Sequence, residues 1–171
     1  MRILGLDPGY ALCGFGIVDY SDNKFDLLTY GCFSTKSDMP FQERLLYIYR
    51  ALCQKIEQYE PDVIAIEELF FSRNTTTAIA AAEARGVLIL AAAQYQVPLF
   101  EYKPIQVKKA VTGHGKADKK QVQEMVKILL KLDSIPRPDD AADALAIACC
   151  QAYTGILPEY KLKSAYNYKT K

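Results

Sequence analysis

The sequence lacks the features that mark several large classes of protein. It contains no tryptophan and a single histidine, His114, so any catalysis or metal binding by imidazole would have to use that residue. No apolar run approaches the ~18 residues needed to cross a bilayer, and the acid at Asp7 comes too early for a secretory signal peptide. We therefore expect a cytoplasmic protein that has no contact with membranes.

Five cysteines are present, but none has the Cys-x-x-Cys spacing of zinc and redox sites. Cys149 and Cys150 are adjacent within a helical pattern, where a disulfide between neighbours would be badly strained. We therefore expect buried, reduced thiols.

Length and composition favour a single globular domain. The chain has 171 residues, of which 50% are hydrophobic and 24% are charged, and one domain commonly takes about 100–200 residues. No internal repeat or low-complexity linker interrupts the sequence. We assign residues 1–155 to the domain and residues 156–171 to a basic tail.

Positive charge is concentrated in the second half of the chain. The net charge is only +1, but residues 103–171 hold 13 Lys and Arg against 7 Asp and Glu, whereas residues 1–102 hold 8 against 13. Eight lysines lie within residues 103–131. Such a segment can bind a polyanion or can be an ordinary solvated helix surface, and the charge alone leaves both interpretations open.

The hydrophobic pattern predicts an α/β fold with a mixed sheet. Three β-rich segments joined by short turns are followed by helical patterns that alternate with two short apolar runs. The strands are expected at 2–6, 14–20, 25–34, 62–67 and 98–102, and the helices at 41–59, 75–96, 104–111, 119–132 and 139–153. Five strands in this order indicate a mixed sheet with helices on its faces.

Acidic residues occur at three places where functional groups commonly gather. Asp7 ends the first strand, Glu67 ends the strand after the first helix, and Asp140 and Asp143 share one face near a helix start. If the first strand is central, the ends that carry Asp7 and Glu67 lie side by side, and ligands bind at that edge. Each acid also has a structural alternative: a turn residue, a solvated strand end, or a first-turn acid that favours the helix dipole.

Four carboxylates in one cleft would repel each other strongly unless cations neutralised them. Two Mg²⁺ ions would balance the four charges, and Mn²⁺ prefers similar oxygen ligands. A pair of such ions about 3.5–4 Å apart is the arrangement that cleaves phosphodiesters. The acids therefore predict a two-metal phosphodiesterase.

Several stretches resemble the RuvC family of Holliday junction resolvases, which belongs to the ribonuclease H-like superfamily. They span residues 1 to about 153 in the family's order and spacing. These stretches are Ile3-Leu4-Gly5-Leu6-Asp7-Pro8-Gly9, Ala65-Ile66-Glu67, Glu83-Ala84-Arg85-Gly86, Gln106-Val107-Lys108 and Asp140-Ala141-Ala142-Asp143-Ala144-Leu145-Ala146-Ile147-Ala148. The resemblance implies a ribonuclease H-like mixed five-stranded sheet flanked by helices.

The resemblance also implies roles for individual residues. The family's catalytic, metal-binding acids fall on Asp7, Glu67, Asp140 and Asp143, its active-site lysines on Lys108 and Lys119, and its junction-opening aromatic wedge on Phe70. Helical spacing would also allow Asp139 in place of Asp140, and the family pattern selects Asp140.

The expected DNA-contacting residues are mostly basic. Arg73 and Arg85 are open to two interpretations, phosphate contact or pairing with acids. The full expected set is Phe70, Arg73, Arg85, Lys108, Lys109, Lys116, Lys119 and Lys120.

The function implied by this resemblance is a metal-dependent endonuclease that resolves four-way DNA junctions by paired symmetric nicks, in DNA recombination and repair. Its implied partners are the branch-migration proteins RuvA and RuvB. A homodimer suits a two-fold symmetric junction. We place part of the interface on the alanine-rich helix at 75–96, although that helix could instead be buried within the monomer.

Two other functions fit parts of the sequence. Gly9, Gly14 and Gly16 after the first strand resemble the phosphate loop of actin-like ATPases, but that fold needs two duplicated lobes. A catalytically silent ribonuclease H-like module that only binds DNA or protein is the second alternative, and the presence of all four acids argues against it.

Overall fold

The computed structural model describes residues 1–69 and 75–155, and within them the chain forms one mixed five-stranded sheet in the order β3-β2-β1-β4-β5. β1 is central: it pairs antiparallel with β2 and parallel with β4. The strands are β1 Arg2–Asp7, β2 Leu12–Ser21, β3 Lys24–Ser34, β4 Val63–Glu67 and β5 Leu99–Tyr102.

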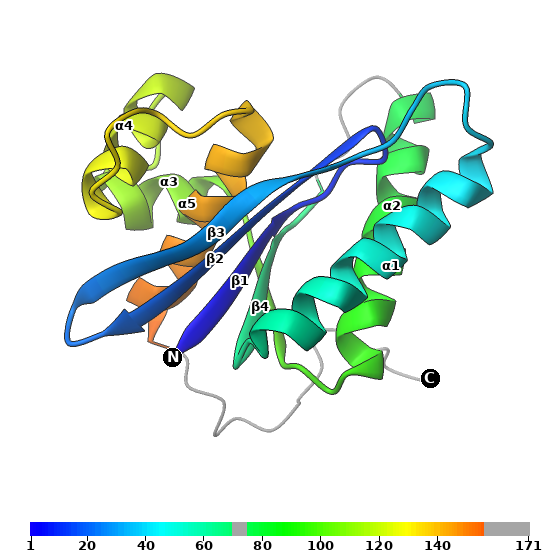
Figure 1. Cartoon of the computed structure of the whole chain (residues 1–171). Coiled ribbons are helices and arrows are strands. Elements are labelled where there is room, and N and C mark those ends of the chain that lie inside the picture. Colours follow the sequence, from blue (N-terminus) through cyan, green and yellow to red (C-terminus); the bar gives the residue numbers. More distant parts are fainter. Residues whose placement is uncertain (70–74, 156–171) are drawn as a thin grey trace, which may run out of the picture.

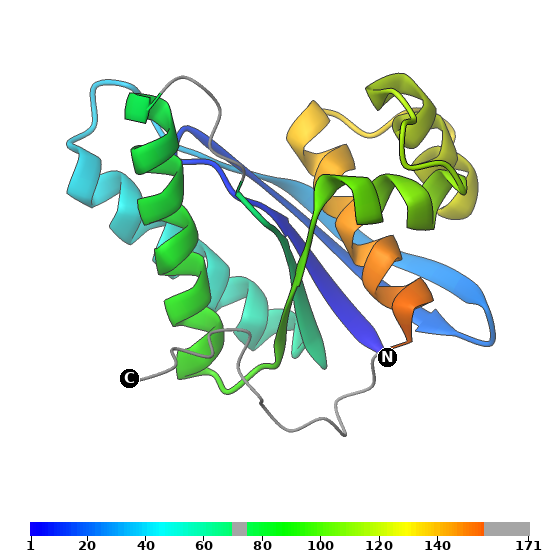
Figure 2. The same ribbon diagram turned by 180° about the vertical axis from the view of Figure 1, so that it is seen from behind.

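Helices cover both faces of this sheet (Figures 1 and 2). One face carries α1 and α2, and the other carries α3, α4 and α5. The helices are α1 Phe41–Tyr59, α2 Thr75–Gln94, α3 Pro104–Thr112, α4 Lys119–Leu129 and α5 Asp139–Thr154. The result is a three-layer arrangement with a separate apolar core on each face of the sheet.

The alternation of side chains along the central strands divides the two cores. Ile3 and Val63 point toward α3, α4 and α5, whereas Leu4 and Ile64 point toward α1 and α2. All four are fully buried. The near-continuous apolar runs in β1 and β4 therefore reflect strands that are buried on both faces.

Local sequence signals explain where elements begin and end. Asp22 and Asn23 both have positive φ, as the tight turn between β2 and β3 requires. The Asp118 side chain accepts a hydrogen bond from Gln121 N at 2.9 Å and caps α4. Gly113 takes the left-handed conformation that ends α3. These caps set the turn between α3 and α4, next to Lys119.

Glycines let α5 approach the sheet very closely. A Cβ atom at Gly14 would lie 2.0 Å from the main-chain oxygen of Asp140, and one at Gly5 would lie 2.1 Å from that of Ala144. The buried face of α5 is rich in alanine, which suits the same short separation. This contact fixes the start of α5, and hence its acids, against β1 and β2.

The predicted element order and mixed sheet are confirmed, with small differences at boundaries. The helix expected at 119–132 ends at Leu129, because the chain turns there and Lys131 adopts a positive φ. All five cysteines are free. Within the described residues, no helix is long and apolar enough to span a membrane.

Candidate active site

Three elements bring the four predicted acids to one edge of the sheet. Parallel pairing of Leu6 with Ile66 places the ends of β1 and β4, and so Asp7 and Glu67, beside each other. Asp7 also pairs with Gly14 of β2, against which the main chain of Asp140 packs. Asp143 follows one turn later on α5. The strand-end positions anticipated from the sequence are therefore those that the fold brings together.

The carboxylates affect one another's ionisation. Burial, together with the charges of Glu67, Asp143 and Asp140, raises the pKa of Asp7 from 3.8 to about 8. Burial and the charge of Asp143 raise the pKa of Glu67 to about 6. Burial also raises the pKa of Asp143, although Lys119 opposes this rise. The cleft thus concentrates negative charge that the protein alone does not fully neutralise.

Two lysines face these acids across a small cavity. A pocket of about 230 Å³ is lined by Glu67, Asp143, Lys108 and Lys119, with an apolar floor. Lys119 Nζ lies 3.0 Å from Asp143 Oδ2. The charges of both lysines oppose the rise in the pKa of Glu67 without cancelling it. The pocket therefore combines carboxylates with cationic groups that could contact a phosphate.

Asp139 has different surroundings from Asp140. Its carboxylate lies 3.4 Å from Lys119 Nζ and pairs with Arg137. It makes no helix-capping bond, because Pro138 is the N-cap residue of α5. Asp139 is therefore a first-turn acid that pairs with Lys119 and does not cap α5. Its contacts favour holding Lys119 over binding a metal.

The donor chemistry of this site suits a hard divalent cation. Carboxylate oxygens are the ligands that Mg²⁺ and Mn²⁺ prefer. A cation would offset the neighbouring carboxylate charge that, after burial, raises the pKa of Asp7. In the described part of the chain, no three His, Cys, Asp or Glu side chains are already gathered as a chelating group. Binding would therefore need side-chain adjustment, including movement of Lys119 relative to Asp143.

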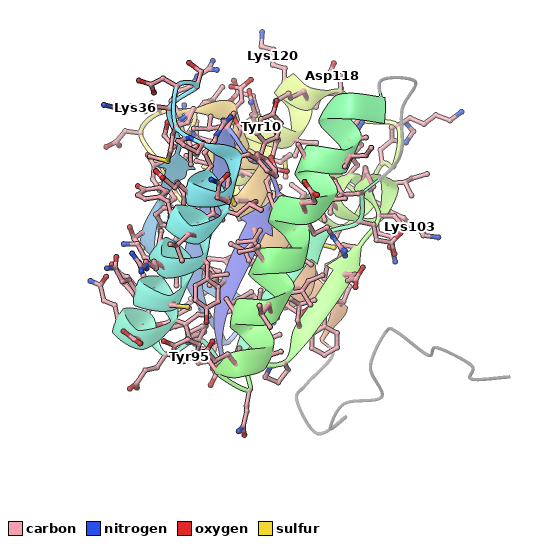
Figure 3. The ribbon with its side chains drawn as sticks, turned by 90° about the vertical axis from the view of Figure 1, so that its right-hand side faces the viewer. Tyr10, Lys36, Tyr95, Lys103, Asp118 and Lys120 are labelled. Atoms are coloured by element: carbon pink, nitrogen blue, oxygen red, sulfur yellow. The ribbon has the colours of Figure 1, made fainter. Side chains whose placement is uncertain are left out.

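The loop that follows Asp7 is held by side chains from the other side of the sheet. The Thr35 hydroxyl donates to the Tyr10 main-chain oxygen at 2.7 Å, and Arg44 Nε donates to Thr35 Oγ1 at 2.8 Å. The Arg44 guanidinium also lies over the Tyr10 ring, 4.8 Å from its centroid. Figure 3 shows Tyr10 at the same end of the molecule as Lys120. These contacts keep the active-site edge in place.

The remaining predicted DNA-contacting residues divide into three groups. Lys109, Lys116 and Lys120 are exposed, and none of them lines the pocket that holds Glu67 and Asp143. Arg85 is buried and pairs with Glu101 of β5, which favours the pairing interpretation left open by the sequence over a phosphate contact. The expected roles of Phe70 and Arg73 lie outside the described residues.

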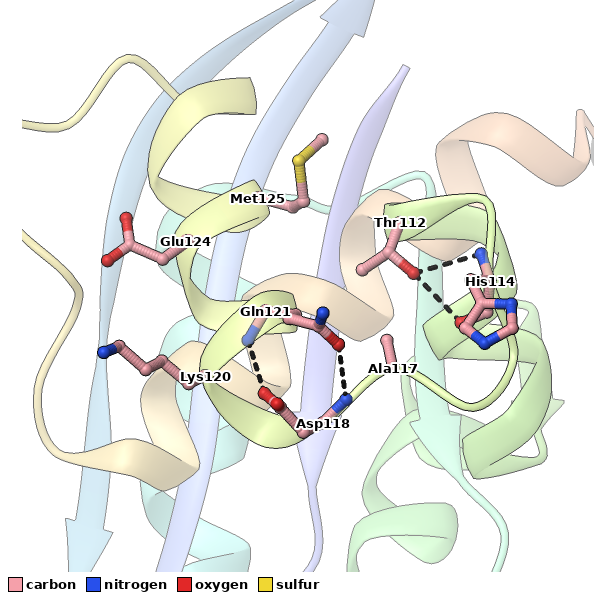
Figure 4. Close-up of a pocket in the computed structure, with 8 residues that line it drawn as sticks. All are labelled: Thr112, His114, Ala117, Asp118, Lys120, Gln121, Glu124 and Met125. Carbon is pink, nitrogen blue, oxygen red and sulfur yellow. Dashed lines mark hydrogen bonds between the residues drawn. The ribbon is translucent and has the colours of Figure 1, made fainter.

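His114 does not line the pocket that holds Glu67 and Asp143. It lines a separate pocket of about 440 Å³ between α3 and α4, together with Lys120 and Glu124 (Figure 4). The four candidate acids are absent from that lining. An imidazole catalyst at the acidic cleft is therefore not supported by the position of His114.

Sequence reasoning missed the contacts that support the site. Glu101 gave a usable signal, because a charged residue inside the short apolar strand Leu99–Tyr102 needs a partner when buried. The contacts of Thr35 and Arg44 gave no sequence signal, because they join segments that only the tertiary fold brings together.

Comparisons with known proteins identify the family of this chain. The sequence profile of the family described as "Crossover junction endodeoxyribonuclease RuvC" matches residues 3–151. The chain is 55% identical to the crossover junction endodeoxyribonuclease RuvC of Alkaliphilus metalliredigens, over 91% of this chain and 94% of that protein. It is 52% identical to the protein of the same name from Alkaliphilus oremlandii, over 95% and 100%.

Solved structures of Holliday junction resolvases are also similar to this chain. Thermus thermophilus RuvC in complex with Holliday junction substrate superposes with a TM-score of 0.86 at 37% identity, over 90% of this chain and 94% of that one. The yeast mitochondrial resolvase Ydc2 superposes with a TM-score of 0.62 at 15% identity, over 88% and 78%; this likeness concerns the fold alone. The fold is therefore the ribonuclease H-like fold of these nucleases.

Proposed function

Because this chain belongs to the RuvC family of crossover junction endodeoxyribonucleases, we propose that it resolves four-way DNA junctions by metal-dependent hydrolysis at the acidic cleft. This activity places it in DNA recombination and repair, in the cytoplasm. The observation that carries the proposal is the convergence of β1, β4 and α5, which brings four acids to one sheet edge beside two lysines.

The four acids would hold the metal. Asp7, Glu67, Asp140 and Asp143 supply hard oxygen ligands, and their charge matches two Mg²⁺ ions, which Mn²⁺ could replace. When bound, such a pair activates the attacking water and stabilises the leaving 3′ oxygen. Burial and the neighbouring carboxylates raise the pKa of Asp7 to about 8, and such ions would neutralise the carboxylate charge.

The two lysines would act on the phosphate. Lys108 and Lys119 line the same pocket as Glu67 and Asp143, so a phosphate bound there would meet both positive and metal-bound groups. Their charges would oppose the negative charge that develops on the phosphate during attack. Hydrolysis breaks the bond between phosphorus and the 3′ oxygen, and the products carry a 5′-phosphate and a 3′-hydroxyl.

DNA would enter along the basic surface that surrounds the cleft. Lys109, Lys116 and Lys120 are exposed on the α3–α4 side, and phosphate contacts of this kind supply much of the affinity for DNA. Phe70 lies three positions after Glu67 in the chain, and we propose that it opens the junction by stacking on a base, the role that the family resemblance implies.

A homodimer would supply the two matched nicks. The outer face of α2 carries Ile79, Gly86 and Leu90, one stripe at helical spacing. Ile79 is 58% exposed and Leu90 61% exposed, while the opposite face of α2 packs on the core. Figure 2 shows α2 on the near side of α1. This stripe is the proposed two-fold contact between copies.

Sedimentation tests the dimer. Leu90→Glu should give a monomer at micromolar concentration, and the exposed Ile128→Glu on α4 serves as the matched control. A wild-type protein that sediments as a monomer with and without junction would refute this part of the proposal. Stimulation of cutting by the RuvA–RuvB complex, also proposed, is tested by adding those proteins to the same cleavage reaction.

Cleavage of branched DNA tests the function as a whole. The protein with Mg²⁺ should nick a synthetic four-way junction at paired symmetric positions and leave a linear duplex of matched sequence uncut. Equal cutting of both substrates would contradict junction selectivity. Binding of the junction without any cutting in Mg²⁺ or Mn²⁺ would favour the alternative of a silent DNA-binding module.

A further inference from the structure

A buried arginine connects α2 to the strand that carries Glu67. Arg85 is only 8% exposed. Its Nη2 pairs with Glu101 of β5, and its Nε donates to the main-chain oxygen of Glu67 at 3.3 Å. One guanidinium thus contacts both the neighbouring strand and the peptide of a candidate metal ligand.

The position of this contact within the strand matters. Glu67 is the last residue of β4, and Glu68 N donates to Tyr102 O at 2.9 Å as the chain leaves the sheet. A hydrogen bond to the Glu67 carbonyl fixes the peptide plane that follows its Cα. Holding that peptide restrains the backbone at Glu67, from which its carboxylate projects.

A buried charge pair that joins two elements carries a large desolvation cost. Desolvation of an arginine and a carboxylate often cancels their attraction, so an apolar pair of similar volume can be equally stable. Arginine, however, offers several donors in a fixed plane, which lets one side chain hold an acid and a carbonyl together. Its geometry is better explained by positioning than by stability.

We propose that Arg85, anchored by Glu101, is a positioning residue that sets the orientation of Glu67 for metal binding. The inference rests on the proposed metal-dependent function. This positioning role takes the place of the phosphate contact that the sequence also allowed for Arg85. Supporting contacts behind metal ligands commonly change metal affinity or activity by about 10–100-fold. Since Arg85 acts through the main chain of Glu67, we expect a smaller effect, about three- to tenfold.

A second arginine, with the same kinds of partner but more exposed, serves as the control. Arg2 also binds one acid and one main-chain oxygen: Nε lies 2.9 Å from Asp19 Oδ1, and Nη1 lies 2.7 Å from the Tyr59 oxygen. It lies at the start of β1, at the opposite end of the strand from Asp7. Arg2→Lys should therefore weaken the fold without changing the metal site.

The test measures Mn²⁺ binding to the metal-free protein by calorimetry, with thermal melting and junction binding measured in parallel. Arg85→Lys should bind Mn²⁺ about three- to tenfold more weakly, keep its affinity for the junction, and regain cutting at high Mn²⁺. Arg2→Lys should bind Mn²⁺ within about twofold of the wild type, even where its melting temperature falls.

Several results would overturn the role of Arg85. Folded Arg85→Lys with wild-type Mn²⁺ affinity would do so, as would equal weakening in Arg2→Lys. Loss of junction affinity with unchanged Mn²⁺ binding would show a DNA contact instead. If Arg85→Lys does not fold, Glu101→Gln decides: it should weaken Mn²⁺ binding, and an unchanged affinity refutes the proposal. Failure of the wild type to bind Mn²⁺ would instead refute the proposed metal site itself.

Discussion

Replacement of Asp7 by asparagine should make the metal-free protein more stable. In the folded chain, burial and three neighbouring carboxylates raise the pKa of Asp7 to about 8. Near pH 7 the folded protein must therefore hold a proton on Asp7 that the unfolded chain releases. Asparagine is neutral and nearly the same size, so Asp7→Asn removes this penalty while it also removes a proposed metal ligand.

The size and pH dependence of the effect follow from linkage. At pH 7, which is below the folded pKa of about 8, the penalty accumulates from the unfolded pKa of 3.8 up to pH 7. At about 1.4 kcal/mol per unit, this interval gives an upper bound of about 4 kcal/mol. Relaxation and water entry reduce such penalties, and we expect about 1–3 kcal/mol. Because the folded pKa is raised, the wild-type free energy of unfolding falls as pH rises from about 4 to about 8. The gain from Asp7→Asn should therefore shrink toward pH 5.

Thermal melting in EDTA and in Mg²⁺ measures both consequences. At about 2–4 °C per kcal/mol for a chain of this size, Asp7→Asn should melt several degrees higher than the wild type in EDTA near pH 7. Mg²⁺ should raise the melting temperature of the wild type more than that of the variant. Asp19→Asn is the opposite control, because its hydrogen bond with Arg2 lowers the pKa of Asp19, and it should lose stability. A folded Asp7→Asn protein that melts at or below the wild type in EDTA would refute the proposed repulsion.

Three further results are expected at the same site. Gly14→Ala should lower stability by about 1–3 kcal/mol and slow cleavage, because its new Cβ would meet the Asp140 oxygen at 2.0 Å; unchanged melting and cutting would contradict the close packing. Cleavage at limiting Mg²⁺ should rise between about pH 6 and pH 8, because metal binding competes with protons on Glu67 and Asp7, whose pKa values are about 6 and about 8; a flat profile would contradict this. Lys119→Ala should reduce the slope of log affinity for junction against log salt by about 0.9 or slow cutting, and no change in either would make Lys119 a solvated surface residue.

The element order of the fold could be predicted because its signals are local. Apolar runs on both faces identify β1 and β4 as buried strands, and their order along the chain places both carboxyl ends at one edge. The close packing of α5 on the sheet is harder to predict from local sequence signals. It depends on the register of Gly14 with Asp7 across two strands and on the main chain of Asp140 that packs on it.

The acids of the site were easier to anticipate than their supporting contacts. Strand ends point to Asp7 and Glu67, and helical spacing points to Asp143 with either Asp139 or Asp140; the family resemblance selects Asp140. Arg85 was left with two interpretations, because its partner Glu101 lies 16 positions away on another element. The pairing of Asp139 with Lys119 likewise depends on how α4 and α5 meet, which no local pattern encodes.

The metal-binding role of the acidic cleft is tested most directly by single-turnover cleavage of a four-way junction in Mg²⁺ by two variants of adjacent residues. Asp140→Asn should bind the junction but cut it more than about a hundredfold more slowly than the wild type, since even supporting contacts of metal ligands change activity by about 10–100-fold. Asp139→Asn, which loses contacts with Lys119 and Arg137, should cut within about tenfold of the wild type. Cutting by Asp140→Asn at the wild-type rate would contradict the proposed site, and the reverse pattern would move the ligand to Asp139.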